Sequence, residues 1–215
     1  MTSKKIYLIR HGQTAFNQRG IVQGSGIDSS LNALGMEQAG LFYAAYKHVP
    51  FDRVYTSTLV RSIQSVSSFV EMGIAHEAHE GLNEINWGNK EGTRITPEEN
   101  DYYRWLLKNW REDKTGLRID GGESPEDVAI RQKPAIEKIL DRGEDRNILV
   151  CMHGRAIRVL LCQLLHYPLS AMDMFEHNNL CLYVLNHTGT MCSVEMFNNR
   201  DHLMEVAPMA QKKAS

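Results

Sequence analysis

Two short apolar runs, each followed by a His-Gly pair, stand out in the pattern of hydrophobic positions along this chain. Residues 6–9 precede His11, and residues 147–152 precede His153. Both runs predict buried strands that end on a histidine. In an open α/β sheet, residues just past the carboxyl ends of parallel strands line the crevice where ligands bind. We therefore expect the two histidines to meet in one site, with at least one guanidinium group beside them.

Helical and strand patterns alternate after the first run. Residues 31–48 and 58–72 carry apolar side chains at helical spacing, and Gly73 marks the end of the second helix. Residues 53–57 form a strand candidate, whereas residues 17–30 are rich in Gly, Ser, Asn and Gln and predict a loop. The order strand, helix, strand, helix indicates an α/β domain.

The second half of the chain continues this alternation. A helix begins at Ser124 and runs to about Asp141, because a hydroxyl N-cap is followed by proline at the first helical position and by acidic residues in the first turn. A second, apolar helix covers residues 155–166. Two β-like runs follow, at residues 180–186 and 191–197.

The middle of the chain, residues 81–122, is less regular. We interpret it as an insertion near the active site, with one helix around residues 97–110, in a single domain that spans residues 1–204. Residues 205–215 form a polar tail. The aromatic residues of the insertion, at this spacing, are typical of the packed face of a helix. They are Trp87, Tyr102, Tyr103, Trp105 and Trp110.

Composition and charge exclude only a few classes of protein. A chain of 215 residues that is 42% hydrophobic and 23% charged can bury the core of one α/β domain. The net charge of -2 argues against broad nucleic-acid binding and leaves room for a local anion pocket. No signal peptide or membrane span fits the N-terminus, and the four cysteines include no Cys-x-x-Cys pair. We therefore expect a soluble, cytoplasmic protein with no membrane partner.

The two strand-end histidines point to phosphoryl transfer. An uncharged imidazole, with a pKa near ~6.5, keeps a lone pair that can attack phosphorus, and His11 is placed for this role. A dianionic phosphoryl group repels a nucleophile, so cations and hydrogen-bond donors must surround its oxygens. Arg10, Arg61 and His153 can supply them. Arg61 can grip two phosphate oxygens in a fork, although an arginine at such a helical position, taken alone, more often faces solvent.

A leaving alkoxide also needs a proton. A carboxylic acid that is held protonated by burial or by the nearby phosphate can donate it. Glu84 is the candidate, because it lies among apolar neighbours in residues 82–92. Glu91 and Glu123 are alternatives, and the residue types do not separate the three.

Taken with their intervals, these residues resemble the histidine phosphatase superfamily, in its phosphoglycerate-mutase-like branch. The resemblance covers about residues 6–186, and the ordered set of motifs is far more specific than a single Arg-His-Gly. The motifs are Leu8-Ile9-Arg10-His11-Gly12-Gln13-Thr14, Asn17, Gln23-Gly24, Leu59-x-Arg61, Leu82-x-Glu84, Gly121-Gly122-Glu123-Ser124 and Met152-His153-Gly154.

The resemblance implies a three-layer α/β/α sandwich with a mostly parallel central sheet. It also implies a phosphohistidine intermediate on His11, formed without a metal or a nucleotide cofactor. Arg10, Arg61 and His153 would bind the transferring phosphoryl group, and Glu84 would be the acid that later activates water. The residues implied to contact the substrate are Asn17, Gln23, Gly24 and Gly154.

Two activities of this family compete: phosphomonoesterase and cofactor-dependent phosphoglycerate mutase. In mutases the segment after the acid usually has the sequence Glu-Arg-His-Tyr-Gly, whose basic and phenolic groups hold phosphoglycerate. In this chain the segment is Glu84-Ile85-Asn86-Trp87-Gly88, which lacks the arginine. We therefore expect water to accept the phosphoryl group from a small-molecule phosphate ester. Sugar phosphates, phosphoglycerates and the ribazole phosphate of cobalamin assembly all fit.

Three details of the resemblance leave alternatives open. Ser124 matches a family segment near the pocket, but we favour its role as a helix cap. Arg155 stands where family members often have a small residue, and it either adds positive charge at the rim of the site or points to solvent. Trp87, Trp105 and the Tyr102-Tyr103 pair give a weaker hypothesis, a pocket wall for an apolar or ring-containing leaving group.

Other interpretations are less favoured. Cys151 and Arg158 superficially resemble the Cys-x5-Arg loop of cysteine phosphatases, but six residues separate them. A metal site made of His11, His153 and Glu84 would place a cation among arginines. A non-catalytic binding module would not need the full set of reactive groups present here. We assign no role to the remaining histidines, which are His48, His76, His79, His166, His177, His187 and His202.

Overall fold

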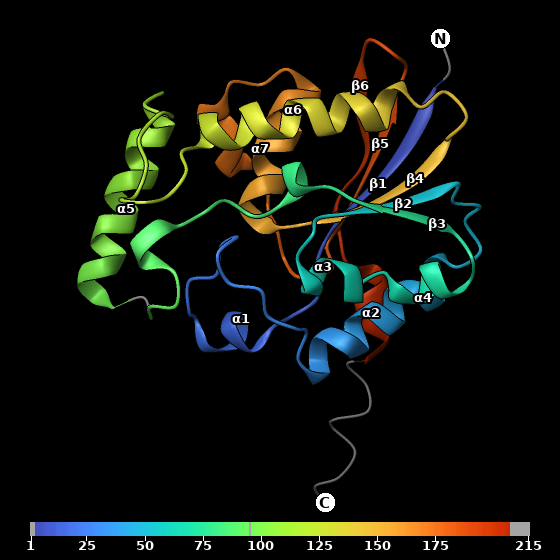
Figure 1. The fold of residues 1–215 in the computed structure, drawn as a ribbon, viewed down its shortest axis with the longest axis horizontal. Helices are drawn as coiled ribbons and strands as arrows, with labels where there is room; N and C mark the ends of the chain where they lie inside the picture. The colour runs from blue at the N-terminus through green and yellow to red at the C-terminus, as the bar shows by residue number, and fades with distance from the viewer. Residues whose placement is uncertain (1–2, 95, 207–215) are drawn as a thin grey trace, which may run out of the picture.

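A six-stranded sheet in the order β3-β2-β4-β1-β5-β6 forms the centre of the molecule (Figure 1). The computed structural model describes residues 3–94 and 96–206. The strands are β1 (Lys4–Arg10), β2 (Arg53–Thr56), β3 (Ala75–Ala78), β4 (Asn147–Met152), β5 (Leu182–His187) and β6 (Cys192–Asn199).

Four neighbouring strands of this sheet run parallel. β3 pairs in parallel with β2, β2 with β4, and β4 with β1, whereas β5 is antiparallel to β1 and β6 to β5. The carboxyl ends of β1, β2, β3 and β4 therefore lie along one edge of the sheet. This confirms the mostly parallel α/β architecture that the alternation of elements predicts.

Helices cover both faces of the sheet and complete three layers (Figure 1). α6 and α7 lie on one face, α2 and α4 lie on the other, and α5 lies beyond the end of the sheet. The helices are α1 (Ala15–Arg19), α2 (Ala33–Tyr46), α3 (Val60–Gln64), α4 (Ser67–Glu71), α5 (Pro97–Arg111), α6 (Pro125–Asp141) and α7 (Gly154–Leu165). Short 3-10 helices are η1 (Glu80–Leu82), η2 (Gly88–Lys90), η3 (Leu169–Met174) and η4 (Asp201–Val206).

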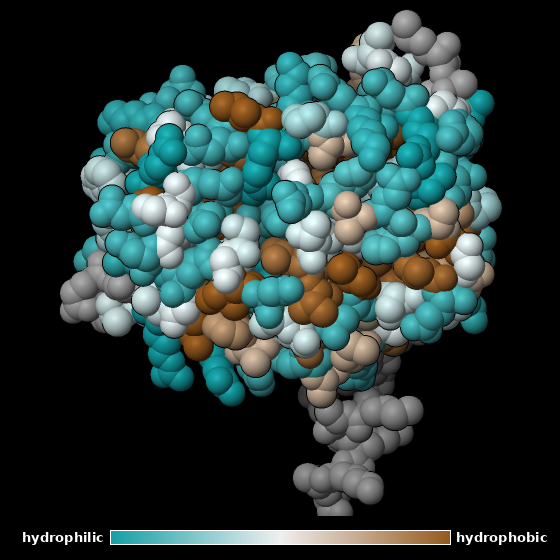
Figure 2. All heavy atoms as spheres, in the orientation of Figure 1, coloured by the Kyte–Doolittle hydropathy of each residue, from teal (hydrophilic) through white to brown (hydrophobic). Residues whose placement is uncertain are grey.

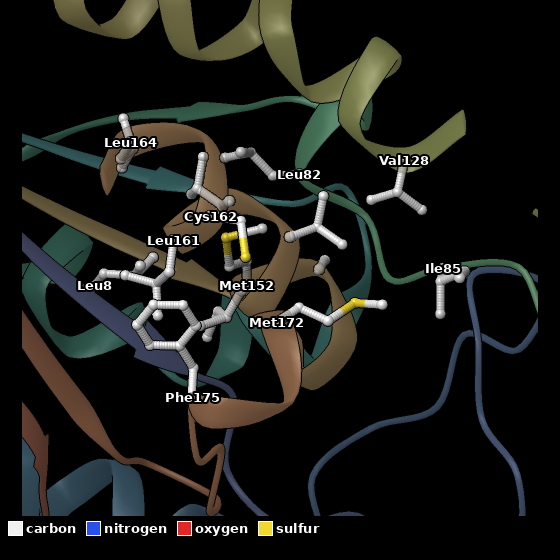
Figure 3. Close-up of a cluster of buried hydrophobic side chains, with 14 of the residues drawn as sticks. Leu8, Leu82, Ile85, Val128, Met152, Leu161, Cys162, Leu164, Met172 and Phe175 are labelled. Atoms are coloured by element: carbon white, nitrogen blue, oxygen red, sulfur yellow. The ribbon is translucent and has the colours of Figure 1, made fainter. Parts of the chain in front are cut away.

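Burial on both faces explains why the β4 run is apolar at almost every position. Val150 and Met152 belong to the core under α6 and α7, whereas Leu149 and Cys151 belong to the core under α2 and α4. Successive side chains of a strand point to opposite faces, so a central strand in a three-layer fold needs apolar residues at consecutive positions. Figure 3 shows Met152 beside Cys162 of α7 within the first of these clusters.

The region 58–72 differs from the single helix that its spacing predicts. It forms two short helices, α3 and α4, separated at Ser65 and Val66. The Ser65 hydroxyl donates to the carbonyl oxygen of Arg61 at 2.7 Å and accepts from the backbone N–H of Gly12 at 2.9 Å. A serine that bonds back to the preceding turn bends a helix, and the contact to Gly12 comes from a segment distant in sequence.

Two further elements depart from the sequence-based expectations. The predicted loop at residues 17–30 begins inside α1, because Thr14 and Asn17 form a reciprocal capping box and Gly20, at φ 63°, ends the helix. The edge strand β3 was not predicted, since its short sequence mixes polar and apolar residues. The helix expected at residues 97–110 is present as α5, with Leu106 and Trp110 fully buried.

The surface is mostly hydrophilic on the face drawn in Figure 2, with hydrophobic side chains in scattered groups. Within residues 3–94 and 96–206, no helix combines the length and the apolar character that crossing a membrane requires. Most of the predicted polar tail, residues 207–215, lies outside the described residues.

Ser124 caps α6, and its replacement tests that role. Its Oγ accepts from the N–H of Asp127 at 3.2 Å, and the Asp127 carboxylate accepts in return from the N–H of Ser124 at 2.8 Å. We expect Ser124→Ala to lower the free energy of unfolding by about 1 kcal/mol in urea denaturation, with Ser124→Thr keeping most of the stability. Loss of the expected phosphatase activity at unchanged stability would instead assign Ser124 to the site.

Candidate active site

The edge formed by the parallel strands brings the two predicted histidines together. His11 follows β1 and His153 follows β4, and their ring centroids are 5.1 Å apart. Both rings are buried. The backbone N–H of His11 donates to the carbonyl oxygen of Met152 at 3.0 Å, which extends the pairing of the two strands to the site itself.

The position of the proton on His11 follows from its hydrogen bond. Its Nδ1 lies 2.7 Å from the carbonyl oxygen of Gly12, which can only accept. Nδ1 therefore carries the proton, and Nε2 carries the lone pair. Ser65 accepts from the N–H of Gly12 and so fixes the peptide that selects this tautomer. Sequence analysis missed Ser65, because its partner lies 53 positions away in the chain.

His11 is held uncharged. Burial, followed by the nearby Arg10 and Arg61, lowers the pKa of His11 well below its usual 6.5. Two guanidinium groups repel a protonated imidazole, whereas they attract an anion in the same place. At neutral pH the site thus combines an uncharged imidazole, which has a free lone pair, with positive charge around it.

Arg10 lines a cavity at this site and has one donor without a partner. Its Nη1 donates to the carbonyl oxygen of His177 at 2.6 Å, while its buried Nε has no hydrogen-bond partner. A buried N–H without a partner is costly, and an anion in the adjacent cavity would satisfy it.

Arg61 is fully buried, which excludes the solvent-facing alternative. Its Nη1 and Nη2 donate to the carbonyl oxygens of Ile27 and Gly24 at 2.7 and 3.0 Å, and its Nε donates to Nδ1 of His153 at 3.2 Å. Burial lowers the pKa of Arg61 to about 10, so it remains charged at neutral pH. Three of its five N–H groups donate to the protein groups named here, and the other two are not used in these bonds.

Both ring nitrogens of His153 have protein partners. Nδ1 accepts from Arg61, so Nε2 carries the proton, and it donates to the Ser57 hydroxyl at 2.7 Å. Burial, followed by Arg61, lowers the pKa of His153 well below 6.5. His153 is thus an uncharged ring whose two nitrogens contact Arg61 and Ser57, and its binding of a phosphoryl group stays a prediction. Ser57, at the end of β2, is a second residue that the motifs did not single out.

The structure separates the three candidate acids. Glu84 Oε1 accepts from the N–H groups of Ile85 and Ala156, both at 2.9 Å, and Oε2 accepts from the N–H of Arg155 at 3.1 Å. The Glu84 carboxylate thus lies at the N-terminus of α7 and faces the cavity.

The carboxylates of the other two candidates, Glu91 and Glu123, bind protein groups away from the cavity. Glu91 accepts from the N–H groups of Trp87 and Gly26, whereas Glu123 forms an ion pair with Arg131 at 2.7 Å. Neither lines the cavity, so geometry favours Glu84 as the acid.

A cavity of about 270 Å³ is lined by Arg10 and Gly154, which are the chain neighbours of His11 and His153, whereas His11, Arg61 and His153 are themselves not among its lining residues. Asn17, Gln23 and Gly154 line it, as the resemblance implies, whereas Gly24 instead offers its carbonyl oxygen to Arg61. His177 also lines it, although the sequence alone does not single out this residue. The full lining is Arg10, Asn17, Val22, Gln23, Glu84, Trp87, Tyr103, Gly154, Arg155 and His177.

Only part of the predicted aromatic wall faces this cavity. Trp87 and Tyr103 line it and their rings are 5.1 Å apart, whereas Trp105 is half exposed and packs near Tyr102. Trp110 is fully buried in the core. The leaving-group hypothesis therefore rests on two rings, and the other aromatic residues serve packing.

The cysteine-phosphatase alternative does not fit this site. Cys151 is fully buried within β4, and burial raises the pKa of its thiol. A thiol with a raised pKa is a poor nucleophile. Among residues 3–94 and 96–206, no cluster of three or more His, Cys, Asp or Glu side chains is arranged to hold a metal ion.

Comparison with known proteins identifies the family of this chain. The family model described as the histidine phosphatase superfamily (branch 1) covers residues 6–200. A curated relative from Yersinia pestis (strain Pestoides F), named "Probable phosphoglycerate mutase GpmB", is 29% identical over 182 residues, which are 83% of this chain and 82% of that protein.

Solved structures share the fold. The α-ribazole phosphatase from Shigella flexneri superposes with a TM-score of 0.80 at 23% identity, covering 91% of this chain and 96% of that one. A mycobacterial glucosyl-3-phosphoglycerate phosphatase, in complex with VO3, superposes with a TM-score of 0.79 at 25% identity, covering 92% of this chain and 100% of that one.

The buried histidines should make the fold sensitive to acid. Burial, followed by Arg10, Arg158 and Arg155, lowers the pKa of His177 to about 3, against 6.5 in an unfolded chain. Below pH 6.5 His177 therefore binds a proton in the unfolded chain but not in the folded chain. The contribution of His177 to the free energy of unfolding is complete above this pH and is lost as the pH falls.

We expect the free energy of unfolding, measured in urea, to fall between neutral pH and pH ~5 in both wild type and His177→Asn. The slope should be smaller in His177→Asn, and the two slopes should differ by up to about 1 kcal/mol per pH unit. His48→Asn, at an exposed position, is the control and should keep the wild-type slope. An unchanged slope in His177→Asn would show that the pKa of His177 is not lowered in the folded protein.

Proposed function

Because this chain belongs to the histidine phosphatase superfamily, branch 1, we propose that it is a phosphomonoesterase that hydrolyses a small phosphorylated metabolite through a phosphohistidine. Family membership makes it an enzyme of the phosphatase type. The observation that carries the proposal is the uncharged ring of His11, whose Nε2 lone pair lies among Arg10 and Arg61. An uncharged nucleophile surrounded by cations is what attack on a phosphate dianion requires.

The first step transfers the phosphoryl group to the enzyme. Nε2 of His11 attacks phosphorus, and the bond from phosphorus to the ester oxygen breaks with its electron pair on that oxygen. Glu84 donates a proton to the departing oxygen, which leaves as an alcohol. Arg10 and the two remaining N–H groups of Arg61 bind the phosphoryl oxygens, and Asn17 and Gln23 contribute from the cavity wall.

The second step returns the enzyme to its starting state. Glu84, now ionised, takes a proton from a water molecule as that water attacks phosphorus. The bond between phosphorus and Nε2 breaks, inorganic phosphate leaves, and His11 regains its lone pair. The bond to Gly12 keeps the second ring nitrogen protonated throughout, so the ring does not change its tautomer.

A mutase activity is the alternative, and the 29% identical relative supports it. A mutase must hold phosphoglycerate while the phosphoryl group is on the histidine. Ile85, which stands where mutases usually have an arginine, is fully buried in the core and offers no charge to a ligand. We therefore assign water as the acceptor.

Replacing the nucleophile tests the covalent step. His11→Ala should reduce phosphate release from aryl and alkyl phosphates by at least about a thousandfold, because the proposed covalent bond to phosphorus forms on this ring. Wild type quenched in alkali during turnover should carry a phosphoryl group on His11, detected by mass spectrometry. Activity retained in His11→Ala would overturn the proposal, and conversion between phosphoglycerate isomers faster than phosphate release would favour the mutase.

Replacing the acid tests the proton transfer. Glu84→Gln should slow the cleavage of an alkyl phosphate by about a hundredfold or more, and that of nitrophenyl phosphate far less, because nitrophenolate leaves without a proton. The measurement is single-turnover release of each alcohol. Glu123→Gln is the matched control and should affect both esters equally, since Glu123 pairs with Arg131 outside the cavity. Equal losses in Glu84→Gln would show that Glu84 is not the acid.

A further inference from the structure

Three arginines surround one carboxylate at the outer side of the active-site cavity. Arg155 and Arg158 of α7 each donate to Oδ1 of Asp173, at 2.7 and 2.5 Å, and Arg111 of α5 lies 3.5 Å from Oδ2. Asp173 supplies one negative charge against three positive charges. The cluster therefore carries excess positive charge beside the cavity.

Arg155 is the member of this cluster that reaches the cavity. It lines the cavity, yet only 8% of the residue is exposed. Its guanidinium packs over the ring of Trp110 at 5.4 Å, and one nitrogen is held by Asp173. Its buried Nε has no hydrogen-bond partner. The side chain is thus fixed in place with an unused donor, which is the arrangement of a preorganised anion ligand.

The phosphoryl group does not account for this charge. Arg10 and Arg61 flank His11 and already supply two cations for a phosphoryl dianion. Arg155 is adjacent to Glu84: its backbone N–H donates to Oε2 of that carboxylate, and both residues line the cavity. Glu84 protonates the departing oxygen in the proposed mechanism, so a cavity-lining side chain next to Glu84 is on the side of the leaving group.

We propose that Arg155 binds a second anionic group, a carboxylate or a phosphate, carried by the leaving group of the substrate. Asp173 acts as a positioning residue that holds the guanidinium against Trp110. This inference rests on the proposed phosphatase function and narrows its substrates to phosphate esters with two anionic groups. Trp87 and Tyr103 would cover the carbon chain between them.

A purely structural role for Arg155 makes a different prediction. In that case the ion pair with Asp173 only ties α7 to η3, and its loss affects all substrates alike. Arg155→Met removes the charge while keeping an unbranched side chain on Trp110, and Asp173 keeps Arg158 as its partner. If Arg155 binds an anion, Arg155→Met changes the ratio of the activities on charged and uncharged leaving groups. If its role is purely structural, this ratio stays the same.

The test uses three esters of similar size: propyl phosphate, the phosphate monoester of β-hydroxypropanoate, and the bisphosphate of the corresponding linear diol. We expect wild type to show a kcat/KM at least about tenfold higher for one of the two doubly anionic esters than for propyl phosphate. Preference for the carboxylate ester or for the bisphosphate identifies which anion is bound.

In Arg155→Met this preference should fall to within about threefold, because kcat/KM decreases far more for the doubly anionic esters than for propyl phosphate. Arg111→Met is the matched control, since Arg111 also approaches Asp173 but is 56% exposed and does not line the cavity; it should keep the preference. If Arg155→Met does not fold, Arg155→Lys replaces it and should reduce the preference in part, because lysine keeps the charge and loses the planar fork.

Two results would overturn the inference. One is a wild type that cleaves propyl phosphate as well as both doubly anionic esters. The other is an equal loss on all three esters in Arg155→Met. If wild type cleaves none of the three, nor nitrophenyl phosphate, the proposed function itself fails, and the narrower inference fails with it.

Discussion

The register between β1 and β4 is the constraint on which the site depends. Arg10 pairs with Met152, so the next residue on each strand is a histidine, and the two rings lie 5.1 Å apart. Parallel pairing of β2 against β4 adds Ser57 at the same edge. A shift of one residue in this register would turn the side chains of a strand to the opposite face and separate the nucleophile from its neighbours.

Buried positive charge is the second constraint, and hydrogen-bond acceptors of the protein stabilise it. Arg61 is fully buried, and two carbonyl oxygens and an uncharged His153 accept its hydrogen bonds. Burying a cation without such partners costs several kcal/mol. Burial and the same cations keep His11 uncharged, so in the proposed mechanism the groups that attract a phosphate also preserve the lone pair that attacks it. Arg10 and Arg155 each keep one buried donor without a partner.

Apart from the edge strand β3, the strands and most helices could be predicted because their pattern is local. The run at 147–152 is apolar because both faces of β4 are covered, and Ser124 starts α6 through contacts within four residues. The region 58–72 could not be predicted in the same way. Its helix breaks at Ser65, whose hydroxyl accepts from the N–H of Gly12, and no spacing within the region carries that information.

The sequence by itself determined the fold class, the two strand-end histidines and the identity of the cationic residues, because apolar runs and motif intervals are properties of neighbouring positions. Only the tertiary structure decided which of three glutamates faces the cavity, which nitrogen of His11 carries the proton, and that both nitrogens of His153 are occupied. These properties depend on hydrogen bonds between segments far apart in the chain. Such bonds depend on how the layers pack, and they cannot be predicted from the order of the residues.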